Sequence, residues 1–391
     1  MSYFFSDLGI VNALGAGKTD VLRGLMAGDR SGMVRYSRLL TGRSTVVGRV
    51  RQPLRALPPH LAKFECRNNR LLATALDEIA PSIAHAVNAV GADRVAVVIG
   101  TSTSGIAAGE DAIDALHREG RMPAKFHYHQ QEIGMAAEFA ASYLGLRGVR
   151  YTISTACSSS ANAFASAQRL LSSGRCDAAV VGGSDSLCRL TLNGFDALEL
   201  LSPELCNPFS ANRNGLNIGE GAAVFVMTRS PAAVRLYGIG ESSDGYHMST
   251  PDPDGRGAEV AMRAALAQAE LQPAGVGYVN LHGTATRKND EMESRVVARL
   301  FGAATPCGST KSLIGHTLGA AGAQELGLCW LVLNASSGRQ RLPTHIWDGI
   351  PDPQLPEINL VGSDERWDRS VFMSNSFAFG GSNTAVAIGY A

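Results

Sequence analysis

The sequence predicts an α/β fold built from layers of strands and helices and arranged as two related halves. Short apolar and β-branched runs alternate with longer stretches whose apolar residues recur near helical spacing. The motifs "VVIGTST" (97–103) and "VNLHGTAT" (279–286) each follow a helical stretch, contain a buried strand and end on Gly-Thr-X-Thr. This echo indicates halves at 1–235 and 236–391. No Pro/Ser-rich linker separates them, so we expect one fused body.

The individual elements follow from the pattern in chain order. Five apolar runs are expected to form buried strands, at 94–100, 177–183, 222–228, 277–283 and 371–376. Three stretches with apolar residues near helical spacing are expected to form helices, at 67–87, 160–174 and 257–272. Strands that alternate with helices are typical of α/β layers.

The composition excludes several classes of protein. A chain of 391 residues that is 45% hydrophobic and 18% charged is a globular chain of one large or two ordinary domains. Its 35 basic and 35 acidic residues cancel, so bulk charge does not indicate a nucleic-acid-binding protein. The longest apolar run, "LGLCWLVL", is far shorter than the ~20 residues of a membrane span. We therefore expect neither nucleic acid nor a membrane span.

The cysteines and the first residues indicate the compartment. Seven cysteines without a CxxC pair argue against a disulfide framework and against a zinc site. The start "MSYFFSDLGIVNALG" has no basic segment and carries an early Asp7, unlike a signal peptide. The expected location is the reducing cytoplasm, and no metal is expected.

Cys157 is the candidate nucleophile. It stands in "ISTACSSSANAF" (153–164), where an apolar run ends and a helix is expected to begin. The partial positive charge of a helix N-terminus favours a thiolate, which is the reactive form of the side chain. The small neighbours Ala156, Ser158 and Ser159 leave room for an electrophile. The alternative role is that of a small buried apolar residue, as for most free cysteines.

Two histidines favour the catalytic interpretation. His282 ends an apolar strand, and His316 lies in "STKSLIGHTLGAAGAQE" five residues after Lys311. Both stand beside glycines at the ends of elements, where a ligand can approach the backbone. One thiol and two imidazoles so placed could form an acyl-transfer site. His127 and His129 alternate like metal ligands, but no acidic or cysteine cluster accompanies them, so a structural role is expected.

Four motifs together resemble the β-ketoacyl-acyl-carrier-protein synthases of the elongating type. They are "TACSSS", "HGTAT", "STKSLIGHTLGAAG" and "SNSFAFGGSNTAV", and the resemblance spans nearly the whole chain. It implies a thiolase-type, five-layered αβαβα fold of two pseudo-repeated halves. It also implies a homodimer, or a heterodimer with a related synthase-like subunit. The partner is acyl carrier protein, and no cofactor is implied, because substrates arrive on the carrier's phosphopantetheine arm.

The resemblance implies a role for each motif residue. Cys157 matches the acyl-accepting nucleophile, and His282 and His316 match the pair that holds the malonyl thioester during decarboxylation. Lys311 matches the lysine beside that pair, and Glu293 matches its partner carboxylate. A lysine so placed would keep the imidazoles neutral by like-charge repulsion.

Further matches concern the substrate channel and the carrier. Phe379 matches a gating phenylalanine whose backbone N–H would form an oxyanion hole with that of Cys157. Thr284 and Thr286 match threonines that touch the phosphopantetheine arm, and Thr103 matches a position at the mouth of the acyl channel. Five basic residues fall in segments that resemble the carrier-docking surface: Lys63, Arg67, Arg70, Arg121 and Lys125.

The expected reaction is the decarboxylative Claisen condensation of the Cys157-bound acyl group with malonyl-acyl carrier protein, in fatty-acid or specialised polyene/polyketide elongation. A thiolase would need a second cysteine near "FAFGGSN", and none follows Cys329. An initiating synthase would pair Cys and His with Asn, whereas "GHTLGAAG" supplies His316. The remaining alternative is a non-catalytic chain-length partner. Such a partner could dispense with the nucleophile, whereas this chain has Cys157.

Some positions depart from the family pattern. This chain has "HGTATRKND" where the family often has "HGTSTP" and small residues, and "FAFGG" where "FGFGG" is common. Asn214 and Leu216 stand where the family often has Asp and Phe. These differences bear on the acyl pocket and on carrier docking.

Overall fold

The structure is a computed structural model that describes residues 2–38, 42–335 and 341–391. One mixed sheet runs through it in the order β12-β11-β10-β13-β14-β9-β1-β8-β7-β5-β6, with β2 paired to β1, and β3 and β4 form a separate ribbon. The strands are β1 (Tyr3–Asn12), β2 (Gly15–Ala16), β3 (Met33–Tyr36), β4 (Thr45–Gly48), β5 (Val95–Gly100), β6 (Arg150–Ile153), β7 (Ala178–Asp185), β8 (Gly221–Thr228), β9 (Val234–Ser243), β10 (Tyr278–Asn280), β11 (Pro306–Gly308), β12 (Asn359–Leu360), β13 (Val371–Phe377) and β14 (Ser382–Tyr390).

The two halves share one topology. In space the N-terminal strands run β1-β8-β7-β5-β6, and the C-terminal strands run β9-β14-β13-β10-β11. Numbered along the chain, both orders read first, fifth, fourth, second, third. In each half the second strand is parallel to the third and fourth, and the fifth strand is antiparallel to its neighbours. The internal echo is therefore a pseudo-repeat, while the boundary after residue 235 stays a prediction.

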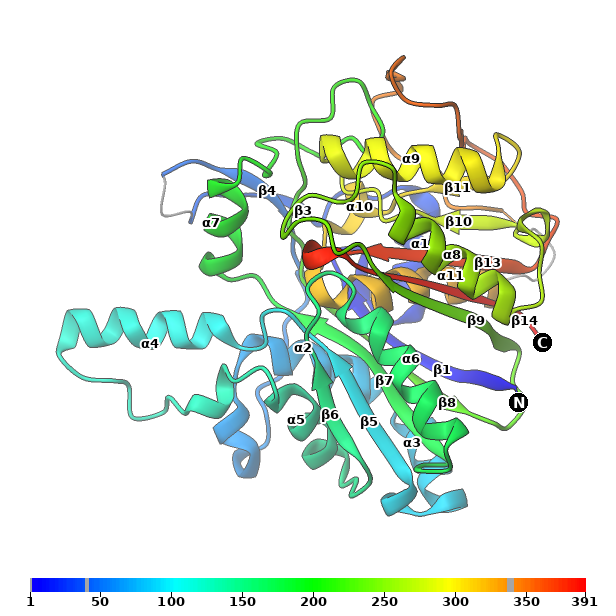
Figure 1. The fold of residues 1–391 in the computed structure, drawn as a ribbon. Helices are drawn as coiled ribbons and strands as arrows, with labels where there is room; N and C mark the ends of the chain where they lie inside the picture. Colours follow the sequence, from blue (N-terminus) through cyan, green and yellow to red (C-terminus); the bar gives the residue numbers. More distant parts are fainter. Residues whose placement is uncertain (1, 39–41, 336–340) are drawn as a thin grey trace.

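Helices complete five layers (Figure 1). The middle layer is α6 and α11: α6 contacts β5 and β7, and α11 contacts β13, β14, β1 and β8. Helices α2, α3 and α5 cover the outer face of the N-terminal strands, and α8 with α9 covers the C-terminal ones. The helices are α1 (Lys18–Ala27), α2 (Arg67–Glu78), α3 (Ala80–Val90), α4 (Ile106–Glu119), α5 (Met135–Leu144), α6 (Ser159–Ser172), α7 (Arg189–Ala197), α8 (Arg256–Gln268), α9 (Arg287–Phe301), α10 (Lys311–Ile314) and α11 (Ala321–Asn334).

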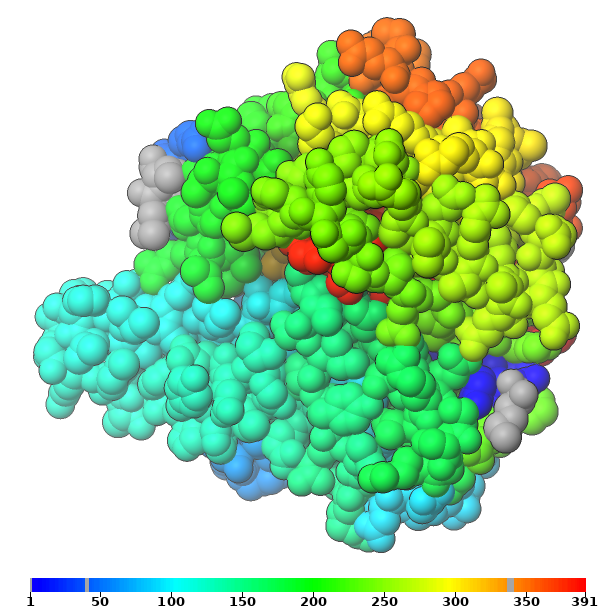
Figure 2. All heavy atoms as spheres, viewed as in Figure 1, coloured from blue at the N-terminus to red at the C-terminus, as the bar shows by residue number. Residues whose placement is uncertain are grey.

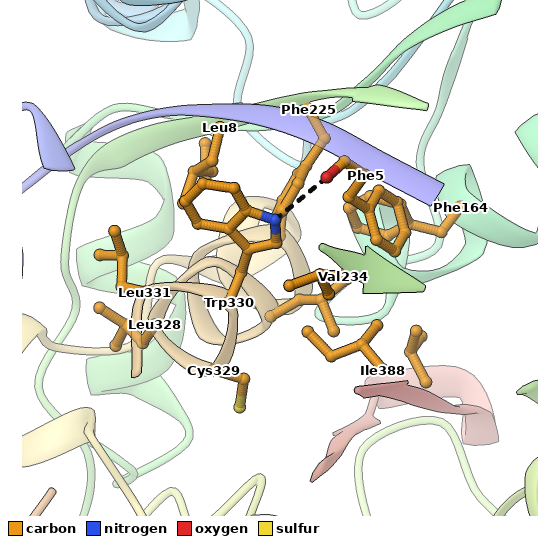
Figure 3. Packing of buried hydrophobic residues seen from close by; sticks show 14 of the residues in the cluster. Phe5, Leu8, Phe164, Phe225, Val234, Leu328, Cys329, Trp330, Leu331 and Ile388 are labelled. Atoms are coloured by element: carbon orange, nitrogen blue, oxygen red, sulfur yellow. Dashed lines mark hydrogen bonds between the residues drawn. The ribbon is translucent and has the colours of Figure 1, made fainter. Parts of the chain in front are cut away.

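The central helix α11 is buried on every side, from Ala321 to Leu333. Its Trp330 lies among Phe5, Leu8 and other apolar side chains, and the indole N–H donates to the carbonyl of Phe5 at 3.4 Å (Figure 3). A Cβ at Gly322 would lie 2.8 Å from Ala161 of α6. Small residues therefore let α6 and α11 approach closely between the N-terminal and C-terminal strands of the sheet.

The predicted elements are present, with differences at their ends. The helix expected at 67–87 is two helices, α2 and α3, because Pro81 in the first turn of α3 lacks the N–H that a continuous helix needs. The strand expected at 277–283 ends at Asn280, so His282 lies on a loop. Within the described ranges, none of the helices has both the length and the apolar character of a membrane span.

The turn between β13 and β14 lies near the junction of the halves. On the face drawn in Figure 2, red atoms of the C-terminal segment are visible between lime-green and teal atoms. The lime-green residues precede or form α8, and the teal residues form much of the N-terminal half, so this C-terminal turn meets both halves.

Candidate active site

Cys157, His282 and His316 meet in the structure. The Cys157 sulfur and a ring nitrogen from each histidine all lie within 4.8 Å of one another. The two imidazoles are edge to face, with ring centroids 5.2 Å apart and planes at 85°. All three residues line a cavity of about 510 Å³. Among the described residues this is the one Cys/His/Asp/Glu grouping with metal-ligand spacing, and its atoms are those that acyl transfer requires.

The turn before α6 places Cys157 in the lining of the cavity. Ser158 is the N-cap and α6 begins at Ser159, so the thiol lies one residue ahead of the cap. Ala156 has a φ of 51°, which is unfavourable for a residue with a side chain and typical of a tight functional turn. Because the rest of the structure holds this turn, the sulfur faces the histidines instead of continuing the strand direction.

Burial corrects the expectation that the helix start makes Cys157 a thiolate. Burial raises the pKa of the Cys157 thiol to about 12, although the Lys311 charge and the Phe379 N–H both lower it. Desolvation disfavours the charged form more than the helix start favours it. The resting nucleophile is therefore a thiol, and its proton needs an acceptor within reach during attack.

The two imidazoles are neutral. Burial, and then the charge of Lys311, holds the pKa of His282 and His316 well below the usual range. His282 is 2% exposed and His316 is 1% exposed. Nδ1 of His282 and both ring nitrogens of His316 have no hydrogen-bond partner among the described residues. Buried polar atoms without partners are costly, so these nitrogens are suited to a group that arrives with the substrate.

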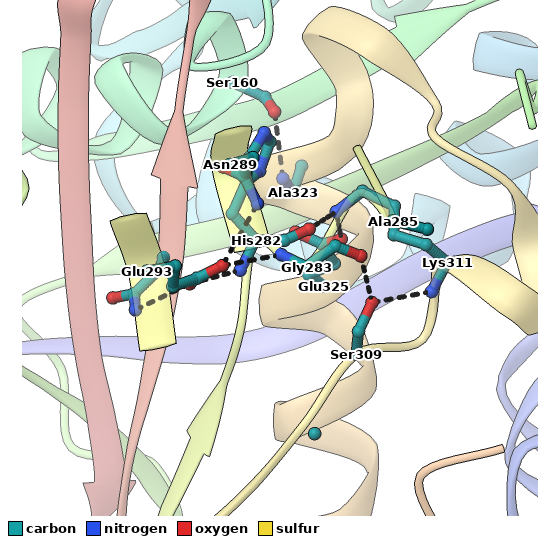
Figure 4. A network of polar contacts seen from close by, with 12 residues as sticks. Ser160, His282, Gly283, Ala285, Asn289, Glu293, Ser309, Lys311, Ala323 and Glu325 are labelled. Carbon is teal, nitrogen blue, oxygen red and sulfur yellow. Dashed lines mark hydrogen bonds and ion pairs between the residues drawn. The ribbon is translucent and has the colours of Figure 1, made fainter. Parts of the chain in front are cut away.

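The partner of Lys311 is Glu325, and the expectation of Glu293 is wrong. Lys311 Nζ forms a buried ion pair with Glu325 and donates to the carbonyl of His282 at 2.6 Å. Glu293 accepts from the backbone N–H groups of His282 and Gly283, at 2.8 and 2.7 Å (Figure 4). Glu293 therefore fixes the loop that carries His282. Glu325 was missed, although a lone acidic residue in an apolar helix is a recognisable signal.

Phe379 lies beside the Cys157 thiol. Its backbone N–H is hydrogen-bonded to the Cys157 thiol. Gly380 and Gly381 have φ values of 82° and 78°, so this tight turn depends on residues without a side chain. The Phe379 ring contacts Phe195 of α7, with centroids 5.5 Å apart.

A polar network behind the cavity connects this loop to the nucleophile turn. Thr384 Oγ1 donates to Asn162 Oδ1 at 2.5 Å, and Asn162 Nδ2 donates to Thr155 Oγ1 at 2.9 Å. Ser158 Oγ donates to Ser382 Oγ at 2.9 Å. The network joins α6 of one half to β14 of the other. Asn162 and Thr384 were not predicted, because no sequence motif shows which polar side chains face each other.

The predicted threonines separate into two groups. Thr284 and Thr286 line the cavity, and their hydroxyls are 2.9 Å apart. Thr103 is fully buried and its hydroxyl donates to Asp185 at 2.7 Å. It also accepts from the Ser186 N–H at 3.2 Å and is not among the residues that line the cavity with Cys157, so its place at the channel mouth stays a prediction.

Of the predicted docking residues, Arg67 has a structural role. Its guanidinium binds both carboxylate oxygens of Glu220, which is fully buried. Arg70 pairs with Glu65 at 2.6 Å. Three of the predicted cations are exposed: Lys63, Arg121 and Lys125.

His127 and His129 contact each other. The backbone N–H of His129 donates to Nδ1 of His127 at 3.2 Å, and the two rings have centroids 4.4 Å apart. This bond caps the short turn that follows Lys125.

A nucleophilic thiol and two neutral imidazoles at the junction of two repeated α/β halves define a thiolase-type condensing enzyme. The family model of the beta-ketoacyl synthase N-terminal domain matches residues 55–233. The family model of the beta-ketoacyl synthase C-terminal domain matches residues 233–342. The chain belongs to the beta-ketoacyl synthase family.

Individual relatives agree with this assignment. Nodulation protein E of Rhizobium leguminosarum bv. trifolii is 39% identical over 264 residues, which cover 64% of this chain and 64% of that protein. The 3-oxoacyl-acyl-carrier-protein synthase 2 of Coxiella burnetii is 30% identical over 410 residues, covering 98% of this chain and 97% of the relative. A chain from the solved complex of the ketosynthase ApeO with its chain length factor ApeC, from Xenorhabdus doucetiae, is 45% identical. It superposes with a TM-score of 0.96, covering 100% of this chain and 98% of that one.

Proposed function

We propose that this chain joins an acyl group held on Cys157 to two carbons of malonyl-acyl carrier protein, releasing CO2 and forming β-ketoacyl-acyl carrier protein. The observation that carries the proposal is the meeting of Cys157, His282 and His316 in one cavity. The thiol can accept an acyl group, and two neutral N–H donors can stabilise an enolate.

Loading begins when the Cys157 sulfur attacks the carbonyl carbon of the acyl thioester. Its proton passes to a nearby imidazole nitrogen, because the buried thiol does not ionise by itself near neutral pH. The backbone N–H groups of Cys157 and Phe379 bind the tetrahedral oxyanion. The intermediate collapses, and the phosphopantetheine sulfur leaves with the proton that the imidazole returns.

Condensation uses the same cavity for a second carrier-bound substrate. The malonyl carboxylate leaves as CO2, and its bonding electrons form an enolate whose oxygen accepts from His282 and His316. Each such donor contributes about 3 kcal/mol of barrier lowering in comparable sites. The enolate carbon attacks the acyl carbonyl, the Cys157 sulfur departs as a thiolate, and this thiolate takes up a proton from solvent.

The proposal includes the partners. The Coxiella burnetii relative is named for acyl carrier protein, and the Xenorhabdus doucetiae ketosynthase was solved with a chain length factor. We extend both relationships to this chain: carrier-bound substrates, and a dimer with a second copy or a related synthase-like chain. In support, β6 is an edge strand, and α4 and α7 expose Ile113, Leu116 and Leu190 at 49%, 39% and 60%. The protruding α4 is clear in Figure 1.

The remaining parts of the proposal concern the boundary and the compartment. We place the boundary between halves after residue 235, beside the start of β9, where the strand order begins to repeat. We place the enzyme in the cytoplasm, which is supported by seven buried free cysteines. No bound cofactor is part of the proposed chemistry.

The direct test is intact mass after exposure of the purified enzyme to acyl carrier protein loaded with different acyl groups. One acyl group should be added, and peptide mapping should place it on Cys157; Cys157→Ala should add none. Malonyl carrier should then yield CO2 and the β-ketoacyl product. If the assembled dimer gains no acyl group on this chain, it is a non-catalytic chain-length partner.

A further inference from the structure

Two exposed cationic side chains stand on the wall of the cavity that contains Cys157. Arg287 and Lys288 are the first two residues of α9, and both line this cavity. They belong to the "HGTATRKND" segment, in which the family pattern has proline and small residues. The reaction proposed above assigns them no role.

The neighbouring charges leave Arg287 available to a ligand. The nearby carboxylate of Asp352 is bonded to Arg213 at 2.5 Å, so Arg287 acts on it only from a distance. Lys288 Nζ lies 3.6 Å from Glu291, and its side chain is 70% exposed. An exposed pair of this kind contributes little, so Lys288 can exchange it for another anion.

The start of α9 adds to the positive potential. No side chain caps the helix at Thr286, and the first N–H groups of a helix carry partial positive charge. The carboxylate of Asp290 in this first turn accepts from the backbone N–H groups of Phe209 and Ala285. The acidic side chains that line the cavity from other segments are Glu199 and Asp244. An anion in the cavity is therefore favoured on the α9 side.

The inner end of the cavity independently indicates a ligand. Both ring nitrogens of His316 are buried without a hydrogen-bond partner among the described residues, and one of them lies within 4.8 Å of the Cys157 sulfur. A thioester that reaches this sulfur on a pantetheine arm carries its phosphate at the opposite, outer end of the arm. Thr284 and Thr286 also line the cavity, and in the sequence they stand between His282 and Arg287.

We propose that Arg287 and Lys288 bind the phosphodiester of the carrier's phosphopantetheine arm and hold the arm in register with Cys157. The proposal rests on the proposed function. A guanidinium donates two parallel N–H bonds to phosphate oxygens, whereas the lysine adds a mobile point charge. Arg287 therefore contributes more than Lys288. The site recognises the arm itself, apart from the surface of the carrier protein.

The experiment compares acyl transfer to Cys157 from acyl carrier protein, from free acyl phosphopantetheine and from acyl pantetheine, which lacks the phosphate. Arg287→Ala should lower kcat/KM about tenfold for both phosphate-bearing donors, the loss of one charge-assisted contact. Lys288→Ala should lower it less. Acyl pantetheine should react equally with the parent and both variants. Arg295→Ala is the matched control, because Arg295 is exposed on the same helix and does not line the cavity.

Each alternative result has its own meaning. An equal loss with acyl pantetheine would show that Arg287 shapes the cavity without reading phosphate, and the proposal would be wrong. A loss confined to the intact carrier would mean that Arg287 contacts the carrier's acidic surface, which also overturns it. If none of the three donors loads Cys157 in the folded parent protein, the proposed function fails instead. Thermal unfolding of the variants, which alter exposed side chains only, checks that they remain folded.

Discussion

Lys311 and Glu325 form an ion pair in which both side chains are only 1% exposed, and the same ammonium donates to the carbonyl of His282. Burial raises the pKa of Glu325 to about 7, against the attraction of Lys311. Removing both charges from water is costly, and their attraction offsets this only while both partners are present. The pair keeps a positive charge beside His282 and His316, where it lowers the pKa of both imidazoles.

Replacing only one partner of this ion pair should destabilise the protein more than replacing both partners. Glu325→Gln leaves the Lys311 charge buried with an incomplete set of partners, and should cost about 3–5 kcal/mol in the free energy of unfolding. The double variant Lys311→Met/Glu325→Leu should recover most of that loss. Urea unfolding measures both. A Glu325→Gln protein as stable as the parent would show that Lys311 does not depend on Glu325 as its partner.

The acid limb of CO2 release should lie below the ordinary histidine pKa of about 6.5. His282 and His316 have lowered pKa values, so they stay neutral as the pH falls through that range. The double variant, which lacks the Lys311 charge, should move this acid limb to higher pH. It should restore the histidine pKa values only in part, because burial lowers them more than Lys311 does. The unfolded chain binds these protons first, so stability is full above about pH 6.5 and falls as the pH drops. Rates of CO2 release from pH 5 to 8 test this, and an unmoved limb would contradict the role of Lys311.

The two half-reactions should separate in His282→Ala and His316→Ala. Release of CO2 from malonyl carrier should fall about 10²–10³-fold in each, the loss typical of one missing oxyanion donor. Loading of Cys157 should persist more slowly, because Phe379 and the remaining imidazole are still in place. Acyl-enzyme mass and CO2 release are measured on one folded sample. Full decarboxylation by either variant would refute the proposed roles of the histidines.

Thr384 should position the loading machinery without touching the substrate. Thr384→Val removes the hydroxyl that donates to Asn162, which loosens the connection between the Phe379 turn and the Cys157 turn. We expect acyl loading to slow about tenfold, consistent with one lost buried hydrogen bond, with CO2 release nearly unchanged. Thr384→Ser keeps the donor and should load normally. Equal losses in both half-reactions would mean that the network is only structural.

Charge reversal should weaken carrier binding at the exposed predicted docking residues and destabilise the fold at Arg67. Lys63→Glu with Lys125→Glu should raise the KM for carrier-bound substrate and flatten its salt dependence, with no change in Tm, because both side chains are exposed. Arg67→Glu should destabilise the fold, since it leaves Glu220 buried and unpaired. An unchanged KM in the first variant would exclude this face as the docking surface.

Much of the site could be predicted from local sequence. Cys157, His282 and His316 each follow a recognisable strand or turn and are surrounded by small residues, so their motifs are visible without the fold. The α/β class followed from alternating apolar patterns, and the repeat from the two Gly-Thr-X-Thr segments. Pro81 marks the break between α2 and α3 equally clearly, although the longer helical pattern around it concealed the break.

Pairing between distant side chains could not be predicted in the same way. Glu293 and Glu325 are both acidic residues near the recognised motifs, and only the tertiary structure, in which α11 packs against β13, determines that Glu325 is the one that reaches Lys311. Thr103 stands in a segment typical of a channel mouth, yet its hydroxyl is bonded to Asp185. Arg67 and Lys63 look alike in sequence and differ because a buried carboxylate faces only one of them.

The sequence by itself determined the class of fold and pointed to Cys157 and the two histidines as candidates, because these depend on residue type and short-range spacing. The tertiary structure alone decided their ionisation. Cys157 lies at the start of a helix, which favours a thiolate, but exclusion of water by two packed halves raises its pKa to about 12 and keeps the imidazoles neutral. Desolvation depends on every residue that surrounds a group, and those residues come from both halves of the chain.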